Sequence, residues 1–162
     1  MWKWFQRIVL ELVVFLAASQ IIRPSRVNPP VDPAREIHAI LPVDPAVASI
    51  FARSCNDCHS YRTVWPWYSG VAPVSWLLAY DVRRGRRKMN FSDWQERPGE
   101  PAQELVKEIC TDVTEGEMPG RGYTLMHPEA AISPANVQAV CAWSRSVGES
   151  LAKVAATGVS VR

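Results

Sequence analysis

Apolar residues recur at helical spacing along most of the chain, and no stretch of any length alternates as a β-strand would. An apolar run covers residues 8–22 near the N-terminus. Four amphipathic stretches follow at 45–55, 74–88, 101–116 and 133–152. There is no internal repeat. The pattern therefore predicts an all-α protein: a small helical domain preceded by an N-terminal helix.

Capping residues mark the ends of several of these helices. Asp44 is followed by Pro45, and Ser133 by Pro134, which in each case places a capping side chain before a proline at the first helical position. Gly116 is the last residue of the third amphipathic stretch, and glycine is the residue type that most often ends a helix. These signals set the expected helix boundaries within the domain.

The N-terminal apolar run is typical of a membrane-directed segment. Lys3 and Arg7 precede it, and with the aromatic residues before it the run approaches the roughly 20 residues needed to span a bilayer. Small residues at 17–19 also suit a cleaved signal peptide, but we favour a retained transmembrane anchor over 1–23. Glu11 is costly in lipid, which favours a contact with another subunit. The charge pattern places the remainder of the chain on the periplasmic side of a bacterial inner membrane.

Prolines divide the membrane segment from the domain. They occur at positions 24, 29, 30, 33, 42 and 45, and they exclude a long helix there. We therefore expect an extended linker at 24–43, a folded domain at 44–152 and a C-terminal tail at 153–162.

Composition narrows the class of protein. With 48% hydrophobic and 21% charged residues the chain is globular, and its net charge of +2 gives no support to nucleic-acid binding. Four cysteines are too few for a disulfide scaffold at this length.

The sequence CNDCHS places Cys55, Cys58 and His59 in the C-x-x-C-H pattern of covalent haem attachment. In this chemistry the two thiols add to the two vinyl groups of one haem, and the imidazole binds its iron. A zinc site would need a second closely spaced pair, whereas Cys110 and Cys141 are far apart in sequence. A thioredoxin-like redox pair would need a βαβ context, which the pattern lacks. One covalent haem c is therefore the expected cofactor.

A second axial ligand to the iron is expected from the far side of the haem. Met118, in the loop sequence GEMPGRGY, is the preferred candidate, because it does not belong to an apolar helical stripe. His127 is the runner-up, followed by Met126, Met89 or an open site. A Met118 ligand predicts a higher reduction potential than a second histidine does.

Several further side chains are candidates for haem packing and hydrogen bonding. Large aromatic rings that could enclose the porphyrin follow the motif at Trp65, Trp67, Tyr68 and Trp76. Donors for the propionates are expected among Asn90, Trp94 and Arg83, Arg84, Arg86 and Arg87, although most of these arginines suit a solvated face. The carbonyl of Pro66 or Pro73 is expected to orient His59.

Cys110 and Cys141 each fall on the inward side of a predicted helix, and the two helices flank the Met118 loop. A disulfide between them would clamp that loop, and two buried free thiols are the alternative.

The chain resembles the bacterial haem-binding-domain group of monohaem c-type cytochromes, which is related in outline to class I cytochromes c. The resemblance covers roughly 44–147. It rests on CNDCHS, on the tryptophan-rich sequence TVWPWYSGVAPVSWLLAYDVRRGRRKMNFSDW, on GEMP and on HPEAAIS. It implies that Cys55, Cys58 and His59 bind haem and that Met118 is the distal ligand. Gly120 replaces the second proline of the group's usual GEMPP loop.

These features together predict a membrane-anchored, periplasmic cytochrome c that carries single electrons and catalyses no bond chemistry of its own. Its expected partners are the membrane and redox proteins, as other subunits of a respiratory or photosynthetic complex. The alternative is a haem sensor or peroxidase-like protein whose distal site is open or held by His127.

Overall fold

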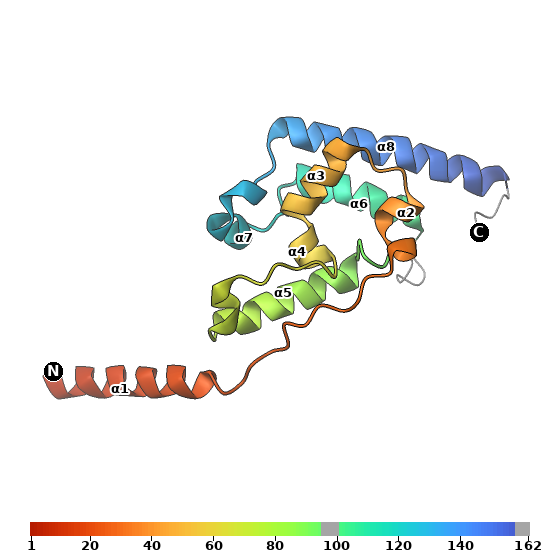
Figure 1. The fold of residues 1–162 in the computed structure, drawn as a ribbon. Coiled ribbons are helices and arrows are strands. Elements are labelled where there is room, and N and C mark those ends of the chain that lie inside the picture. The colour runs from red at the N-terminus through yellow and green to blue at the C-terminus, as the bar shows by residue number, and fades with distance from the viewer. Residues whose placement is uncertain (95–100, 158–162) are drawn as a thin grey trace.

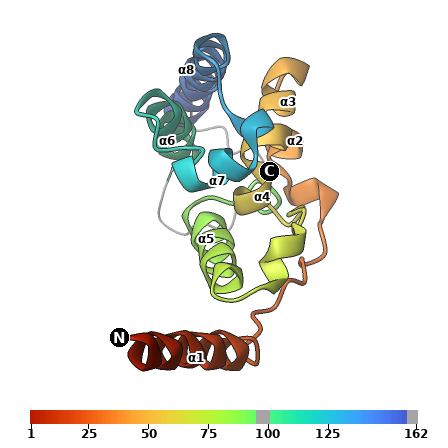
Figure 2. The same cartoon turned by 90° about the vertical axis from the view of Figure 1, so that its left-hand side faces the viewer.

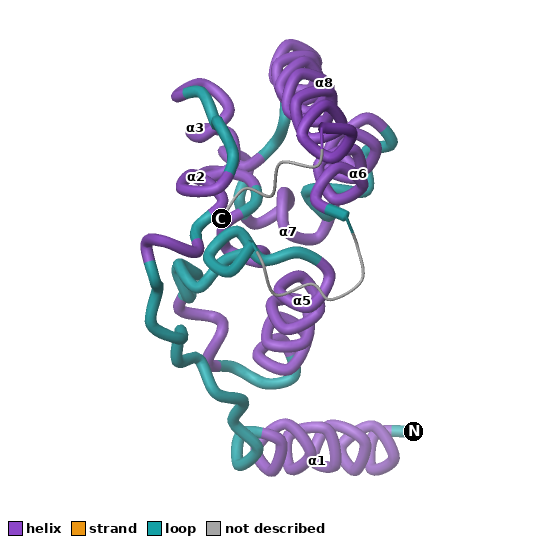
Figure 3. The backbone as a smooth tube through the Cα atoms, turned by 90° about the vertical axis from the view of Figure 1, so that its right-hand side faces the viewer, coloured by secondary structure: helices purple, strands orange, loops and turns teal. Residues whose placement is uncertain are grey.

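A computed structural model describes residues 1–94 and 101–157, and all regular structure within those ranges is helical (Figures 1 and 3). The prediction of an all-α protein is confirmed. The α-helices are α1 (Trp2–Ser19), α2 (Ile37–Ile40), α3 (Pro45–Ser54), α4 (Asn56–His59), α5 (Val74–Lys88), α6 (Ala102–Thr114), α7 (Arg121–Met126) and α8 (Pro134–Thr157). Three 3₁₀ turns are η1 (Pro33–Arg35), η2 (Trp67–Gly70) and η3 (Pro128–Ala130). The tail expected at 153–162 continues α8 to residue 157, and the rest of it lies outside the described residues.

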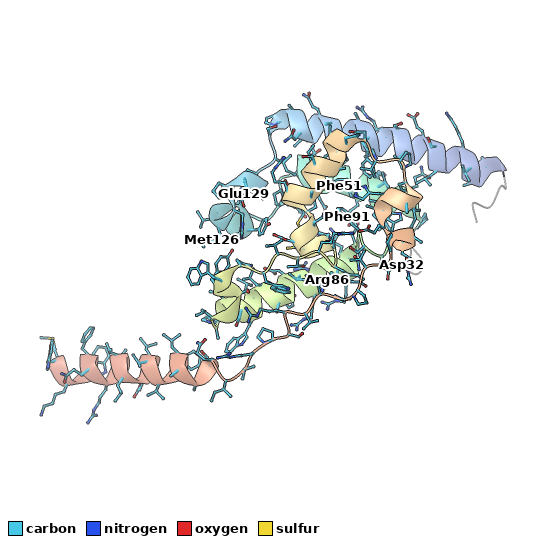
Figure 4. The ribbon with its side chains drawn as sticks, in the orientation of Figure 1. Asp32, Phe51, Arg86, Phe91, Met126 and Glu129 are labelled. Carbon is cyan, nitrogen blue, oxygen red and sulfur yellow. A yellow bond between two sulfur atoms is a disulfide. The ribbon has the colours of Figure 1, made fainter. Side chains whose placement is uncertain are left out.

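The hydrophobic core lies where α3 meets the paired helices α6 and α8 (Figures 1 and 2). Phe51 is at its centre: its ring lies 4.9 Å from that of Phe91 and 5.2 Å from that of Trp143, the latter in an edge-on arrangement. Figure 4 labels Phe51 and Phe91, which both belong to this core. Val106 and Val140 complete the contact between α6 and α8, and both are fully buried. This core holds α3 in place and, with it, the motif at the end of α3.

The expected helix caps form. The Asp44 carboxylate accepts hydrogen bonds from the backbone N–H groups of Ala46 and Val47, each at 3.0 Å. The Ser133 hydroxyl accepts one from Asn136 N–H at 3.2 Å. Gly116 follows α6 with a φ of 71°, a conformation that favours glycine.

The N-terminal helix differs from the expected transmembrane anchor. Of the helices in the described ranges, none combines the length and the apolar character that a membrane span requires. α1 ends at Ser19, before the expected limit at residue 23, and Lys3, Arg7 and Glu11 interrupt its apolar sequence.

The proline-rich segment is only in part the extended linker that was expected. Ile37 and Leu41 belong to the buried core, and the Asn28 side chain donates a hydrogen bond to the Thr63 carbonyl at 2.8 Å. Arg86 of α5 donates to Asn28 Oδ1 at 2.8 Å. The second half of this segment is therefore part of the folded domain.

Cys110 of α6 and Cys141 of α8 form a disulfide, with their Cα atoms 4.8 Å apart. Of the two alternatives, a disulfide or two buried free thiols, the disulfide is therefore confirmed. It joins the two helices on either side of the chain segment that carries Met118.

Candidate haem site

The C-x-x-C-H motif lies at a sharp break between two helices. Cys55 separates α3 from the single turn α4, which carries Cys58 and His59. The Cys55 carbonyl accepts hydrogen bonds from Cys58 N–H at 3.2 Å and from His59 N–H at 2.9 Å. All three side chains are partly buried. The tight turn brings two thiols and an imidazole into one small region of the structure.

α5 supports this turn through a very close backbone contact. A Cβ atom added to Gly85 would lie 2.5 Å from the Cys58 carbonyl oxygen and 3.0 Å from its carbonyl carbon. Real Cβ atoms do not approach backbone atoms so closely. Only glycine at position 85 therefore allows α5 to pack beneath the motif.

His59 is oriented by the backbone just beyond α5. Its Nδ1 lies 3.1 Å from the Met89 carbonyl oxygen, which can only accept, so Nδ1 carries the hydrogen. Burial lowers the pKa of His59 and favours the neutral ring, although the Met89 hydrogen bond acts in the opposite direction. Nε2 is left as the nitrogen with a free lone pair, as a metal-binding histidine requires. The prediction that the carbonyl of Pro66 or Pro73 orients His59 is therefore wrong.

Two adjoining hollows open beside the motif. The larger has a volume of about 400 Å³ and the smaller about 60 Å³, and both are lined by Cys58, His59 and Met118. Cys55 lines the smaller one. The four residues predicted to attach haem and bind its iron thus share one continuous depression.

Met118 is held in this depression by the end of α6. Its N–H group and that of Glu117 both donate to the Asp112 carbonyl, at 3.2 and 3.0 Å respectively. The Met118 side chain is 37% exposed. Of the other candidate methionines, Met126 lines the larger hollow, whereas Met89 is buried beside His59 and lines the smaller.

His127, the alternative ligand, has both ring nitrogens in hydrogen-bonding contacts. Nε2 lies 2.7 Å from the Tyr68 hydroxyl and Nδ1 lies 3.2 Å from Glu129 Oε1. Its ring also stacks on Tyr123, with centroids 4.6 Å apart. His127 is not among the described residues that line either hollow.

Of the aromatic residues predicted to enclose the haem, only Tyr68 lines the hollow. The indole N–H of Trp65 donates to Asn28 Oδ1 at 3.3 Å, and that of Trp76 donates to the Ile22 carbonyl at 2.8 Å. Trp67 is 83% exposed. Trp65 and Trp76 therefore fix the N-terminal segment to the domain.

Asn90 and Trp94 lie elsewhere as well. Both are buried, and both line a separate hollow together with arginines of α5. The Asn90 side-chain oxygen accepts a hydrogen bond from Ser92 N–H at 3.0 Å. Among those arginines, Arg86 donates to the Ser60 carbonyl at 2.8 Å and its guanidinium lies 5.3 Å from the centre of the Tyr61 ring, which gives it a structural role (Figure 4).

Two polar residues of the site, Tyr123 and Lys88, were not predicted. Tyr123 of α7 donates a 2.6 Å hydrogen bond to the Asp57 carboxylate, inside the motif. Lys88 of α5 lies 3.0 Å from both Glu108 and Asp112 of α6 and lines both hollows. These contacts join segments far apart in sequence, and no local spacing signals them.

Burial raises the pKa of the Cys55 thiol to about 12 and that of Cys58 to about 11. The carboxylates of Asp57 and Asp81 add to the effect at Cys58, and a nearby arginine opposes it at each thiol. Such thiols remain protonated at neutral pH. A thiol-redox site instead needs a lowered pKa. Cys110 and Cys141, which a zinc site would need, are bonded to each other.

Comparison with known proteins identifies the family. A family model described as a haem-binding domain matches residues 14–146 of the 162-residue chain, so the chain belongs to this family. No curated protein and no solved structure matches it. The depression fits haem, the group that the family name implies, because a neutral imidazole, a thioether sulfur and two thiols line it together.

Proposed function

We propose that this haem-binding domain is a c-type cytochrome, in which Cys55 and Cys58 form thioether bonds to one haem. The observation that carries the proposal is that both thiols, the His59 imidazole and the Met118 thioether line one continuous depression. The free nitrogen of His59 is suited to the iron on the motif side. The Met118 sulfur would supply its second protein ligand.

Single-electron transfer is the function that this arrangement supports best. A bound haem iron supplies the Fe(II)/Fe(III) couple, and a thioether ligand stabilises the reduced state relative to a second imidazole. With both side chains bound, the iron would have no coordination position for a substrate. The chain's own part is to hold His59 through the Met89 carbonyl, to hold Met118 through the Asp112 carbonyl and to limit access of water.

Met118 is preferred to His127 as the distal ligand. His127 would have to give up its contacts with Tyr68 and Glu129 before it could bind iron. A sensor or peroxidase-like protein would need either His127 as the ligand after that rearrangement or an open distal site. Met118 lines the hollow, which argues against each of these two alternatives.

We further propose that the domain works on the periplasmic side of a bacterial inner membrane, as part of a respiratory or photosynthetic complex. Haem is attached to such motifs outside the cytoplasm, and the disulfide between Cys110 and Cys141 also suits an oxidising compartment. The exposed apolar surface of α1 supports attachment to the membrane or to a partner within it.

Covalent attachment is tested by acid–acetone extraction and a pyridine haemochrome spectrum of protein made in cells that mature c-type cytochromes. We expect the pigment to stay with the polypeptide and both vinyl groups to be saturated. Replacing Cys55 and Cys58 by serine should release the haem. Replacing Cys110 and Cys141 should leave it attached. Extraction of all pigment from the unaltered protein would overturn the proposal.

The distal ligand is tested by the near-infrared absorption of a ferric haem bound to methionine sulfur. We expect this band in the unaltered protein, its loss in Met118→Ala and its retention in Met126→Ala, which removes another methionine from the same hollow. A band that survives Met118→Ala would show that another group binds the iron.

A further inference from the structure

The exposed large apolar side chains of the domain are concentrated at the haem depression. Beyond residue 22, the exposed large apolar residues of the described ranges lie in the segments 67–80 and 125–126 and at Met118. Val27 and Val64 are the two exceptions. Helices α3, α6 and α8 carry no exposed large apolar residue in their described parts. One side of the domain is therefore much more apolar than the others.

A bound haem would cover only part of this surface. Trp67, Val71 and Leu125 are 83%, 46% and 80% exposed, and they flank the depression without lining it. We call these three residues the apolar rim. Because they lie outside the depression, the rim stays exposed when haem is bound, and an apolar surface of this kind marks a site of interaction.

The second half of α1, after Glu11, is apolar on every side. The consecutive residues 12–16 are all large, apolar and exposed, and successive side chains on a helix point about 100° apart. A protein groove covers one stripe of such a helix, whereas lipid surrounds it completely. This half of α1 therefore fits the apolar part of a bilayer better than it fits the surface of another protein.

The end of α1 is fastened to the domain beside the apolar rim. The Gln20 side chain makes two hydrogen bonds with the backbone of Ala72, at 3.0 and 3.1 Å, and Trp76 donates to the Ile22 carbonyl at 2.8 Å. Ala72 directly follows Val71 of the rim. In Figure 1, α1 projects toward the same side of the molecule as α7, which carries Leu125.

We propose that the apolar rim rests on the surface of an anionic phospholipid bilayer that takes up α1, with the mouth of the haem depression beside that surface. The fastening at Ala72 leaves little chain between the lipid-embedded helix and the rim. Arg23 and Arg26 are exposed at the junction and suit anionic headgroups. The proposal rests on the membrane attachment proposed above. It implies that the electron partner reaches the haem at the membrane surface.

The test uses a spin label on the complete haem-loaded chain. With Cys55 and Cys58 bound to haem and Cys110 and Cys141 in a disulfide, a single added cysteine is the only free thiol. Leu125→Cys labels the rim, Val71→Cys labels it at a second point, and Gln138→Cys on exposed α8 is the control. Each label is measured with reduced haem, on vesicles of phosphatidylglycerol and phosphatidylcholine, for its access to dissolved oxygen and to a water-soluble nickel complex.

We expect vesicles to raise the ratio of oxygen access to nickel access several-fold at positions 125 and 71 and to leave it unchanged at 138. Equal, unchanged ratios at all three positions in vesicle-bound protein would overturn the proposed orientation while leaving membrane attachment intact. Failure of the protein to bind vesicles would overturn both the proposed orientation and the membrane attachment. The haemochrome spectrum of the same samples tests the cytochrome proposal independently, since it does not depend on lipid.

Discussion

The two walls of the haem depression are built in different ways. On the His59 side, α5 contacts the motif backbone directly at Gly85, and the ring is held by a main-chain carbonyl. On the Met118 side, the loop between α6 and α7 is bonded to the Asp112 carbonyl of α6. Hydrogen bonds and ion pairs of side chains then join this wall to the His59 side, from Tyr123 to Asp57 and from Lys88 to Asp112.

This difference suggests a division of roles. A wall fixed by backbone packing tolerates little change, because a displaced atom has nowhere to go. A wall held by hydrogen bonds and ion pairs can be loosened in small steps without unfolding the domain. We therefore expect changes on the His59 side to disrupt the fold and changes on the Met118 side to alter iron ligation first.

The largest effect is expected from Gly85→Ala. The added methyl group would collide with the Cys58 carbonyl, so the loss of unfolding free energy should exceed about 3 kcal/mol, the upper end of the range for an overpacked core. Thermal unfolding and haem content are the measurements. Gly148→Ala in α8 is the matched control: its nearest new contact is 3.9 Å away, and it should stabilise the helix by about 0.5–1 kcal/mol. Equal stability of the two variants would contradict the close contact.

The next largest effect is expected from removal of the disulfide. The cross-link closes a loop between residues 31 apart in sequence, so replacing both Cys110 and Cys141 by serine should cost roughly 3 kcal/mol of unfolding free energy. Denaturant unfolding measures the loss. Covalent haem should be retained, because the change lies away from the His59 wall. Without reductant, thiol alkylation should leave the mobility of the unaltered haem-loaded protein in electrophoresis unchanged, and a shift would show free thiols.

An intermediate effect is expected from Tyr123→Phe, which removes the 2.6 Å hydrogen bond to Asp57. A bond to a charged acceptor contributes about 2 kcal/mol, and its loss should weaken the methionine–iron absorption band as α7 loosens. Tyr80→Phe, at an exposed position of α5, should change neither quantity. A normal band in Tyr123→Phe would mean that this contact does not position Met118.

The smallest effect is expected from Lys88→Met, about 1 kcal/mol, because the ion pairs with Glu108 and Asp112 are partly exposed. Lys107→Met is the control, since its contact with Glu104 is 3.9 Å long and well exposed. Lys88→Arg should restore much of the loss. The free energy of unfolding of all three variants is measured with denaturant at low and at high salt.

The same residue gives a prediction for alkaline pH. Burial alone would lower the pKa of Lys88, but hydrogen bonds to Asp112 and Glu108 outweigh it and raise the pKa above its ordinary value of 10.5. The contribution of Lys88 is therefore complete below about pH 10.5 and is lost as the pH rises through the folded-state pKa. The stability gap between the unaltered protein and Lys88→Met should narrow over that range. A constant gap would contradict the raised pKa.

Features of the fold that depend on local sequence could be predicted. Asp44 followed by Pro45 placed the start of α3, and helical spacing placed α5, α6 and α8. The motif spacing brought Cys55, Cys58 and His59 together because one helical turn joins them. The facing positions of Cys110 and Cys141 followed from the apolar stripes, although the stripes alone did not decide between a disulfide and free thiols.

Features that depend on long-range contacts could not be predicted. The acceptor for His59 is Met89, which lies 30 residues away along the chain. Trp65 and Trp76 hold the N-terminal segment, because their indole groups find acceptors there that no local pattern reveals. Ile37 and Leu41 were assigned to a linker because of the prolines around them, yet they enter the core.

The contacts of the N-terminal segment set a lower limit on how far the chain can be shortened. Arg86 joins Asn28 to Thr63 and Ser60, the residues through which the chain leaves the motif. A fragment that started at Asp44 would lack Ile37 and Leu41, which are buried in the core, and would leave Arg86 without one of its acceptors. The minimal autonomous unit for expression and crystallisation therefore begins upstream of Asn28.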